Sequence, residues 1–351
     1  MNQPRVLQIK VVNSAAIAAE KRNSWLVFLE VITSCSLVAG LFYVAFFVKL
    51  SSEVPNIKPS AFGNRDNYFD IVSVKKNSDI LWAVGRGGKV IRSDDRGNNW
   101  QIQNVPVQSH LQSIALWDEN TAIVIGDHGV ALLTENGGGH WRQLKLPIRE
   151  FGEQLLNVIT SGDKEAWLVG RMGTVMHSTD RGHNWIMRHP EEDVSFNNIT
   201  INPDGSLWLV GEFGKIKKSI DNGLNWQEID SQTNNSLMGI AFANEKVGVA
   251  VGLSGTLLST LDGGQNWQAQ SLSIDSHFYN VAWLGDRFAA VGNGSVLLTG
   301  KPEQWNLRIL NNTGRWYTSI IADADSIYLS GSNIIRIQDN EIQQFSDVRK
   351  P

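Results

Sequence analysis

The sequence predicts an all-β protein: a seven-bladed β-propeller of four-stranded blades, preceded by one N-terminal transmembrane helix. Two observations predict the propeller. A string that ends in tryptophan recurs five times, and a weaker and a degenerate copy follow; the first glycines of the seven copies are 39–44 residues apart. Each copy also offers four short strand signals. A period of about 40–50 residues with four strands is typical of a propeller blade, and closing the blades into a ring removes long sheet edges.

Residues 25–48 form the predicted membrane span, because they are apolar apart from Glu30. A helix needs about 20 apolar residues to cross the hydrocarbon layer. Basic residues precede this segment, and few follow it closely. By the positive-inside rule, residues 1–24 stay in the cytoplasm and the propeller lies in the periplasm, which describes a single-pass protein of the inner (cytoplasmic) membrane.

An alternative for the same segment is a lipoprotein, since Ile32-Thr33-Ser34-Cys35 loosely fits a lipoprotein cleavage box. Apolar residues continue after Cys35, where lipoproteins usually become polar, so the uncleaved anchor is favoured. Both interpretations tether the protein to a membrane. Glu30 either reaches to the membrane interface or contacts a membrane helix of a partner, because carboxylates inside a membrane are costly.

A polar linker at residues 49–67 follows, and the propeller is predicted over residues 68–351. Each complete repeat ends in Ser/Thr-x-Asp-x-Gly-x-x-Trp, the pattern of the Asp box, which we place at the turn between the third and fourth strands. The carboxylate can accept backbone N–H bonds in that turn, the glycine supplies a positive φ, and the tryptophan is expected to pack on a neighbouring blade. These residues are given structural roles: Asp95, Trp100, Asn136 in place of Asp, Trp141, Asp180, Trp185, Asp221, Trp226, Asp262 and Trp267.

The composition excludes several classes of protein. The chain is 42% hydrophobic, which is enough for a packed core and argues against collagen-like or disordered chains. A single Cys excludes a disulfide framework and a Cys-based metal cluster. The body carries more acidic than basic residues, which argues against binding to a nucleic-acid backbone.

No catalytic constellation is recognisable, although Asp boxes also occur in sialidases and other glycosidases. A sialidase needs an arginine cluster, a tyrosine nucleophile with a glutamate beside it, and an acid/base aspartate. None of the five tyrosines lies in such a context. We therefore expect no enzyme activity, cofactor or metal. The alternative is a glycoside hydrolase or a carbohydrate-binding propeller.

The residues that vary between repeats point to a binding face. The turns between second and third strands have the form Gly-x-x-Gly, and we expect them on the same face as the loops between blades. That face mixes both charge signs with aromatic side chains, which suits recognition of a protein, although an ordinary solvated face has the same polarity. The candidate partner-binding residues are Arg86, His128, Arg149, Arg171, Glu212, Phe213, Arg315 and Trp316.

The in-phase repeats W-x-V-G-x-x-G-x-(V/I/L)-x-x-(S/T)-x-D-x-G-x-x-W, together with the N-terminal anchor, resemble the photosystem II assembly and stability factor family over about residues 66–347. The resemblance implies a non-enzymatic assembly factor that binds nascent membrane-protein subunits, and an arginine patch to which Arg86, Arg149, Arg171 and Arg315 could contribute. The long apolar anchor favours a bacterial periplasmic relative, and some of these are linked to transporters of the resistance-nodulation-division type.

These observations together predict a non-catalytic, membrane-anchored scaffold that assists an integral membrane-protein complex, with a transporter as one candidate partner. A transporter subunit in the strict sense would co-purify with its complex at fixed stoichiometry. The sequence leaves open which face binds and how the first and last blades close the ring.

Overall fold

The computed structural model describes residues 14–47, 61–63, 66–74, 79–148, 153–310, 314–323 and 325–345. The chain divides into two units, Met1–Lys58 and Pro59–Pro351. The first unit contains helix α1 (Ser14–Phe47), which begins well before the predicted span. Among the residues that the structure describes, no helix is both long and apolar enough to cross a membrane. The span over residues 25–48 therefore stays a prediction.

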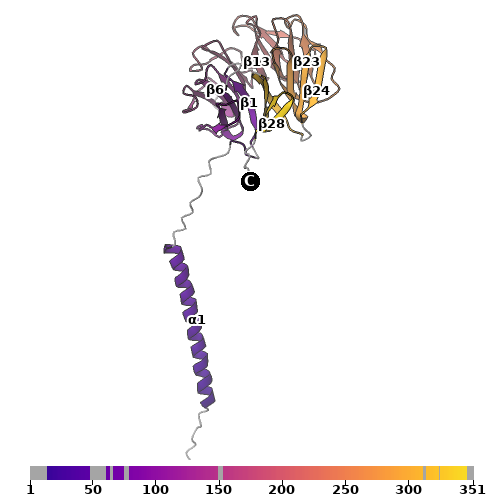
Figure 1. Cartoon of the computed structure of the whole chain (residues 1–351). Coiled ribbons are helices and arrows are strands. Elements are labelled where there is room, and N and C mark those ends of the chain that lie inside the picture. Colours follow the sequence, from indigo (N-terminus) through magenta and orange to yellow (C-terminus); the bar gives the residue numbers. More distant parts are fainter. Residues whose placement is uncertain are drawn as a thin grey trace, which may run out of the picture. The chain divides into compact units, whose positions relative to one another are not determined.

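The second unit is a β-propeller (Figure 1). Its described residues form seven separate four-stranded sheets, and in each sheet the strands are consecutive in sequence and antiparallel to their neighbours. This confirms the predicted architecture of seven four-stranded blades. The repeat period was a reliable guide because each blade is one copy of the repeat.

The strand bounds follow the repeats closely. Blades 1 and 2 are β1 (Tyr68–Ser73), β2 (Leu81–Gly85), β3 (Val90–Ser93), β4 (Gln101–Ile102) and β5 (Leu111–Leu116), β6 (Ala122–Gly126), β7 (Ala131–Thr134), β8 (Arg142–Gln143). Blades 3 and 4 are β9 (Leu155–Ser161), β10 (Glu165–Gly170), β11 (Val175–Ser178), β12 (Ile186–Met187) and β13 (Phe196–Ile201), β14 (Leu207–Gly211), β15 (Ile216–Ser219), β16 (Gln227–Ile229).

The remaining three blades contain the two longest outer strands. Blade 5 is β17 (Leu237–Phe242), β18 (Gly248–Gly252), β19 (Leu257–Thr260) and β20 (Gln268–Ala269). Blades 6 and 7 are β21 (Phe278–Trp283), β22 (Phe288–Gly292), β23 (Val296–Lys301), β24 (Gln304–Ile309) and β25 (Tyr317–Asp323), β26 (Ser326–Gly331), β27 (Ile334–Gln338), β28 (Glu341–Phe345). The four strands of every blade are called A to D below, in chain order.

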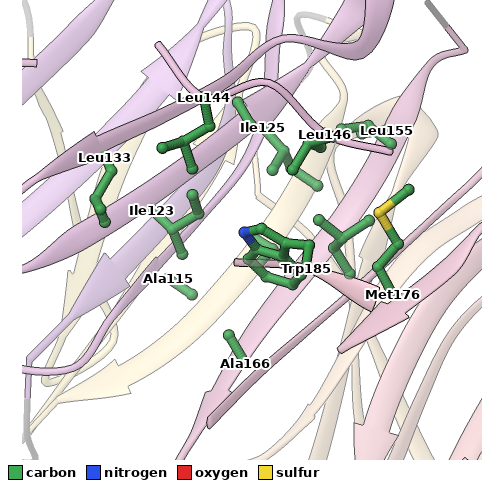
Figure 2. Packing of buried hydrophobic residues seen from close by; sticks show 13 residues of the cluster. Ala115, Ile123, Ile125, Leu133, Leu144, Leu146, Leu155, Ala166, Met176 and Trp185 are labelled. Atoms are coloured by element: carbon green, nitrogen blue, oxygen red, sulfur yellow. The ribbon is translucent and has the colours of Figure 1, made fainter. Parts of the chain in front are cut away.

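The hydrophobic core lies between the blades rather than within them. Seven clusters of buried side chains occur, and each joins two consecutive blades of the ring. Figure 2 shows the cluster between blades 2 and 3, which contains Trp185 of blade 3 together with Ile123, Leu133 and Leu144 of blade 2. Burial of apolar surface at these junctions is therefore what holds one blade to the next.

The Asp-box turns connect strands C and D, as blade 5 illustrates. The Thr260 hydroxyl donates to Asp262 Oδ1 at 2.8 Å and accepts the backbone N–H of Gly264 at 2.9 Å. Asp262 Oδ1 also accepts the backbone N–H of Asn266 at 3.0 Å. In blade 4 the Asn225 side chain and backbone N–H donate to Asp221, and these bonds lower the pKa of Asp221 to about 2. The aspartate thus stabilises the turn as an ionised acceptor.

Each Asp-box turn also packs on the blade before it. The glycine Gly264 has a φ of +81°, and a Cβ there would lie 2.1 Å from Cη2 of Trp208 on strand B of blade 4. The tryptophan that ends the same box, Trp267, lies 6.2 Å from Trp208 between ring centroids and is 1% exposed. Blade 2 repeats this arrangement, with Trp141 at 5.7 Å from Trp82 of blade 1. The box is therefore a seal between neighbouring blades.

The ring closes without a shared strand. Strand β1 pairs with β2, and blade 7 supplies all four of its own strands. Blades 7 and 1 meet instead through side chains: the Thr318 hydroxyl donates to the carbonyl of Phe69 at 2.8 Å, and the Tyr328 hydroxyl donates to the carbonyl of Arg96 at 3.1 Å. Phe345 packs on Trp100 at 6.1 Å between centroids.

One carboxylate on strand β1 ties three blades together at the closure. Asp70 Oδ1 accepts the hydroxyl of Ser319 from blade 7 at 2.7 Å, and Oδ2 accepts the hydroxyl of Ser113 and the N–H of Ile114 from blade 2 at 2.7 and 3.0 Å. Burial raises the pKa of Asp70, while these hydrogen bonds oppose that shift. Because its donors come from both neighbours, Asp70 links blade 1 to blades 7 and 2 at the closure.

If the Asp-box turn packs tightly on the preceding blade, adding a side chain at its glycine should lower the free energy of unfolding. Gly264→Ala should destabilise folding by roughly 2–4 kcal/mol, because the methyl group meets Trp208 and alanine disfavours a positive φ. Gly205→Ala is the matched control: its φ is +85°, and a Cβ there has nothing within 4 Å. Urea unfolding of the full chain in mild detergent, followed by tryptophan fluorescence, measures both. Equal losses would contradict the seal.

If Asp70 closes the ring, its substitution should destabilise folding more than that of other side-chain acceptors near the A strands. Asp70→Ala should cost roughly 2–4 kcal/mol, because it leaves donors of blades 7 and 2 without their acceptor. Asp127→Ala is the control, since Asp127 accepts two glutamine amides away from the closure at 2.9 and 2.7 Å. Thermal unfolding followed by circular dichroism compares them. If Asp70→Ala is no less stable than Asp127→Ala, the carboxylate does not close the ring.

Candidate partner-binding face

The turns between strands B and C lie beside the loops that join one blade to the next, as predicted. In blade 2 the backbone N–H of Asp127 donates to the carbonyl of His110, which precedes strand β5, at 2.9 Å. A Cβ on Gly126 would lie 2.1 Å from that same carbonyl oxygen, so only glycine fits. We call the surface made by these B–C turns and the interblade D–A loops the turn face. The Asp boxes lie at the other ends of strands B and C.

Four turns on this face hold a side chain in the left-handed backbone region. The third residue of Gly-x-x-Gly has a positive φ in every blade from 1 to 6. Glycine fills the position in blades 1 and 6, as Gly87 and Gly294. The other blades carry non-glycine residues with φ of 53–59°: His128, Met172, Phe213 and Ser254. Such residues store backbone strain, which is characteristic of functional sites.

Phe213 is the most prominent of these side chains. It belongs to the short helical turn η3 (Glu212–Gly214) and is 66% exposed. Its neighbour Glu212 is not free for a partner, because its Oε2 accepts the backbone N–H of Ser195 at 2.8 Å. His128 is exposed in the equivalent turn η2 (Asp127–Gly129). An exposed phenylalanine in a strained turn is a suitable anchor for a protein partner.

The predicted arginine patch is only partly displayed. Arg86, in turn η1 (Arg86–Gly88), and Arg171 are both exposed, and no described residue forms an ion pair with either. Arg315 differs, because its Nη1 is buried and has no hydrogen-bond partner among the described residues. The Arg315 residue as a whole is partly exposed, so its role in partner binding stays a prediction. Arg149 lies outside the described residues.

Trp316 contributes to the wall of the face rather than to a free surface. Its ring stacks on Phe69 at 6.1 Å with an interplanar angle of 16°, and Phe69 in turn lies 6.1 Å from the ring of His110. His110 Nδ1 accepts the backbone N–H of Gly87 at 3.1 Å. These contacts cross the seam between blades 7, 1 and 2, so the three rings brace the exposed turn that carries Arg86.

A cavity of about 160 Å³ lies in the central channel and is lined by strands A of all blades. Its polar lining includes Gln112, Asn157, Asn197, Asn198, Asn280 and Asp70. The amides also join blades, since Asn157 Oδ1 accepts the N–H of Ile199 at 3.2 Å. Asp70 is the single carboxylate among the lining residues. Glycoside hydrolysis generally requires a pair of carboxylates, and this lining does not supply one.

Among the described residues, no group of three or more His, Cys, Asp or Glu side chains is placed to hold a metal ion. The residue that sequence reasoning missed is Asp70. The sequence did contain a pattern that could have indicated it. At the same register position, the A strands of five other blades carry small polar residues: Ser113, Asn157, Asn198, Asn280 and Ser319. A lone carboxylate in that series of small polar residues marks an unusual junction.

The comparison with solved structures supports the fold. A structure described as YCF48 bound to D1 peptide matches with a TM-score of 0.65 and 17% identity, over 82% of this chain and 94% of that one. The GH74 xyloglucanase from Xanthomonas campestris matches with a TM-score of 0.65 and 13% identity, over 84% of this chain and 55% of that one. At these identities the likeness shows the propeller fold alone.

The sequence comparisons identify the family. The photosystem II assembly lipoprotein Ycf48 of Synechococcus sp. (strain CC9902) is 32% identical over 88 residues, which is 24% of this chain and about a quarter (26%) of that protein. The family model described as photosynthesis system II assembly factor YCF48 matches residues 98–189 and 224–313, which together are more than half of the chain. The chain belongs to the family of the photosynthesis system II assembly factor YCF48.

Proposed function

We propose that this protein is a non-catalytic assembly factor that captures part of a membrane protein on its turn face. One observation carries the proposal: Phe213 is held exposed in a strained left-handed turn, where glycine would be the unstrained choice. On the opposite face, Arg96 and Arg181 have a similar φ and use their side chains internally. Arg181, for example, donates to Asp118 Oδ2 at 2.7 Å. The Phe213 side chain, in contrast, is 66% exposed.

The charge on the turn face suggests the chemistry of the partner. Arg86 and Arg171 are exposed, and their main-chain N–H groups donate to the carbonyls of Asn67 and Gln154, both at 3.0 Å. Among the described residues, neither guanidinium group forms an ion pair. Guanidinium groups bind carboxylates with paired hydrogen bonds. A relative with the same fold has been solved with D1 peptide bound. We therefore propose that the partner presents an acidic or carboxylate-ended segment beside an apolar residue.

A membrane anchor would hold this face near its partner. The support is the sequence of residues 25–48, which contains a single charge at Glu30 and follows a basic N-terminal segment. We propose that this segment tethers the propeller on the periplasmic side of the inner membrane. The tether raises the local concentration of the propeller, so a modest affinity for the partner suffices. Glu30 is the proposed contact with a membrane helix of that partner.

The identity of the partner separates two forms of the proposal. A photosystem II subunit is the partner that the family suggests, and a transporter complex is the alternative for a bacterial relative without photosynthesis. A glycosidase or carbohydrate-binding role is the rival class, and its support is a shared fold with GH74 enzymes alone.

The turn-face proposal predicts a loss of capture without a loss of stability. Arg86→Ala/Arg171→Ala should lower partner recovery about tenfold when the full-length chain is purified from native membranes in mild detergent. Arg142→Ala/Arg287→Ala is the matched control. Arg142 lies on strand β8 and Arg287 in the turn between β21 and β22, both away from the turn face. Mass spectrometry quantifies the partner in each sample. Equal recovery from both double variants would place the binding site elsewhere.

Phe213 provides a second, independent prediction. Phe213→Gly should raise the stability of the propeller by roughly 0.5–1 kcal/mol, because glycine adopts the left-handed region without strain. The same change should weaken partner capture, because the anchor side chain is gone. If Phe213 had a structural role, Phe213→Gly would instead lower the stability of the propeller. Urea unfolding measures the stability change, and the pull-down measures partner capture.

The anchor is tested by fractionation. The full chain should stay in the membrane pellet after alkaline carbonate extraction, and a chain lacking residues 1–48 should become soluble. Cys35→Ala should leave retention unchanged if the segment is a helix anchor. Loss of retention in Cys35→Ala would instead support lipidation at Cys35, and a soluble full chain would contradict any membrane tether.

A further inference from the structure

The outer edge of blade 6 differs from the outer edges of the Asp-box blades. In blades 1 to 5 strand D has two or three residues, whereas β24 runs over six, Gln304–Ile309. Blade 6 lacks an Asp box, and a two-residue turn at Pro302 and Glu303 connects β23 directly to β24, with φ of +69° at Glu303. Figure 1 shows β24 on the outer rim of the propeller, outside β23.

The main-chain groups that β24 directs outward follow from its register with β23. Gln304 pairs with Lys301 across the tight turn, and Leu310 donates its N–H inward to the carbonyl of Ser295 at 2.9 Å. Inward bonding alternates along an antiparallel strand. Gln304, Asn306 and Arg308 therefore bond to β23. The N–H and C=O groups of Trp305, Leu307 and Ile309 point away from the sheet.

The same three residues put their side chains on one face. They pair with Gly300, Leu298 and Val296 of β23 respectively, and Leu298 and Val296 belong to the cluster between blades 5 and 6. Trp305 packs against that cluster, whereas Leu307 is 39% and Ile309 is 60% exposed. A long edge strand with exposed aliphatic residues and no lysine is a template for pairing with another strand.

We propose that β24 pairs, antiparallel, with β24 of a second copy of this chain, with the twofold axis at Leu307. This register uses all three outward residues: Leu307 faces Leu307 of the second copy, and Trp305 faces Ile309 of the second copy. Each facing pair exchanges two main-chain hydrogen bonds. The apolar side chains then meet across the axis, as they do in stable cross-strand pairs.

Charge favours a second copy over an unrelated strand. In this register Arg308 lies opposite the uncharged Asn306 of the second copy, so no like charges face each other. Arg308 Nη2 is already held by the carbonyl of Asn340 at 3.0 Å, which points its guanidinium toward blade 7 and away from the axis. The other long outer strand, β28 (Glu341–Phe345), has Glu341, Gln343 and Gln344 exposed and lacks this self-complementarity.

A charge-swap experiment on the full-length chain in mild detergent tests the pairing. The wild type should show a concentration-dependent monomer–dimer equilibrium in analytical ultracentrifugation. Leu307→Lys should weaken the dimer about tenfold or more, because two ammonium groups then face each other at the axis. Mixing Leu307→Lys with Leu307→Glu should restore dimers of one copy each. Gln344→Lys, on β28, is the matched control and should leave the equilibrium unchanged.

Cysteine cross-linking tests the register. In a Cys35→Ser background, Leu307→Cys should form an intermolecular disulfide on mild oxidation, since facing Cα atoms about 5.5 Å apart lie within disulfide range. Ile309→Cys should cross-link poorly, because its opposite residue is Trp305. Three results would overturn the proposal: a wild type that is monomeric at all concentrations, equal cross-linking at both positions, or Leu307→Cys joined to a different protein.

Discussion

The contact between an Asp-box turn and the preceding blade is the interaction on which the rest of the molecule depends. Within the turn, the aspartate and the hydroxyl before it fix the backbone, as the bonds of Thr260, Asp262 and Gly264 show. The fixed backbone then lies directly on Trp208 of the blade before. These contacts join five pairs of consecutive blades, from blades 7 and 1 to blades 4 and 5, because blades 1 to 5 carry the Asp box. Asp70 adds hydrogen bonds between blades 7, 1 and 2.

The two faces of the propeller therefore differ in how their side chains are used. On the Asp-box face, Arg96 and Arg181 are engaged within the fold, by ion pairs with Asp79 at 2.8 Å and Asp118 at 2.7 Å. The turn face repeats one backbone shape but changes the side chain in each blade. Its stability comes from glycine contacts and main-chain bonds, so positions such as Arg171 and Phe213 can vary without weakening the ring. A rigid scaffold with variable turns is the usual basis of a binding surface.

Much of the fold could be predicted from the sequence, because the blade repeat is local. The in-phase glycines and tryptophans indicated the number of blades, their four strands and the face that carries the turns. The closure could not be predicted, because Asp70 of blade 1 meets Ser319 of blade 7 only after the chain has come full circle. The burial of the Arg315 Nη1 atom could not be predicted from the sequence either, because it depends on tertiary packing. The strain at Phe213 was visible only in the backbone, although glycine at the same place in blade 1 was a hint.

The central claim is that the turn face, and not the Asp-box face, meets the partner. The most direct test places a photo-reactive benzoylphenylalanine at Phe213 or at Ile220, an 84% exposed position of an Asp-box turn, in the full-length chain in its native membranes. Binding at the turn face should give a single membrane-protein adduct from position 213 and none from position 220. An adduct from position 220 alone would contradict it.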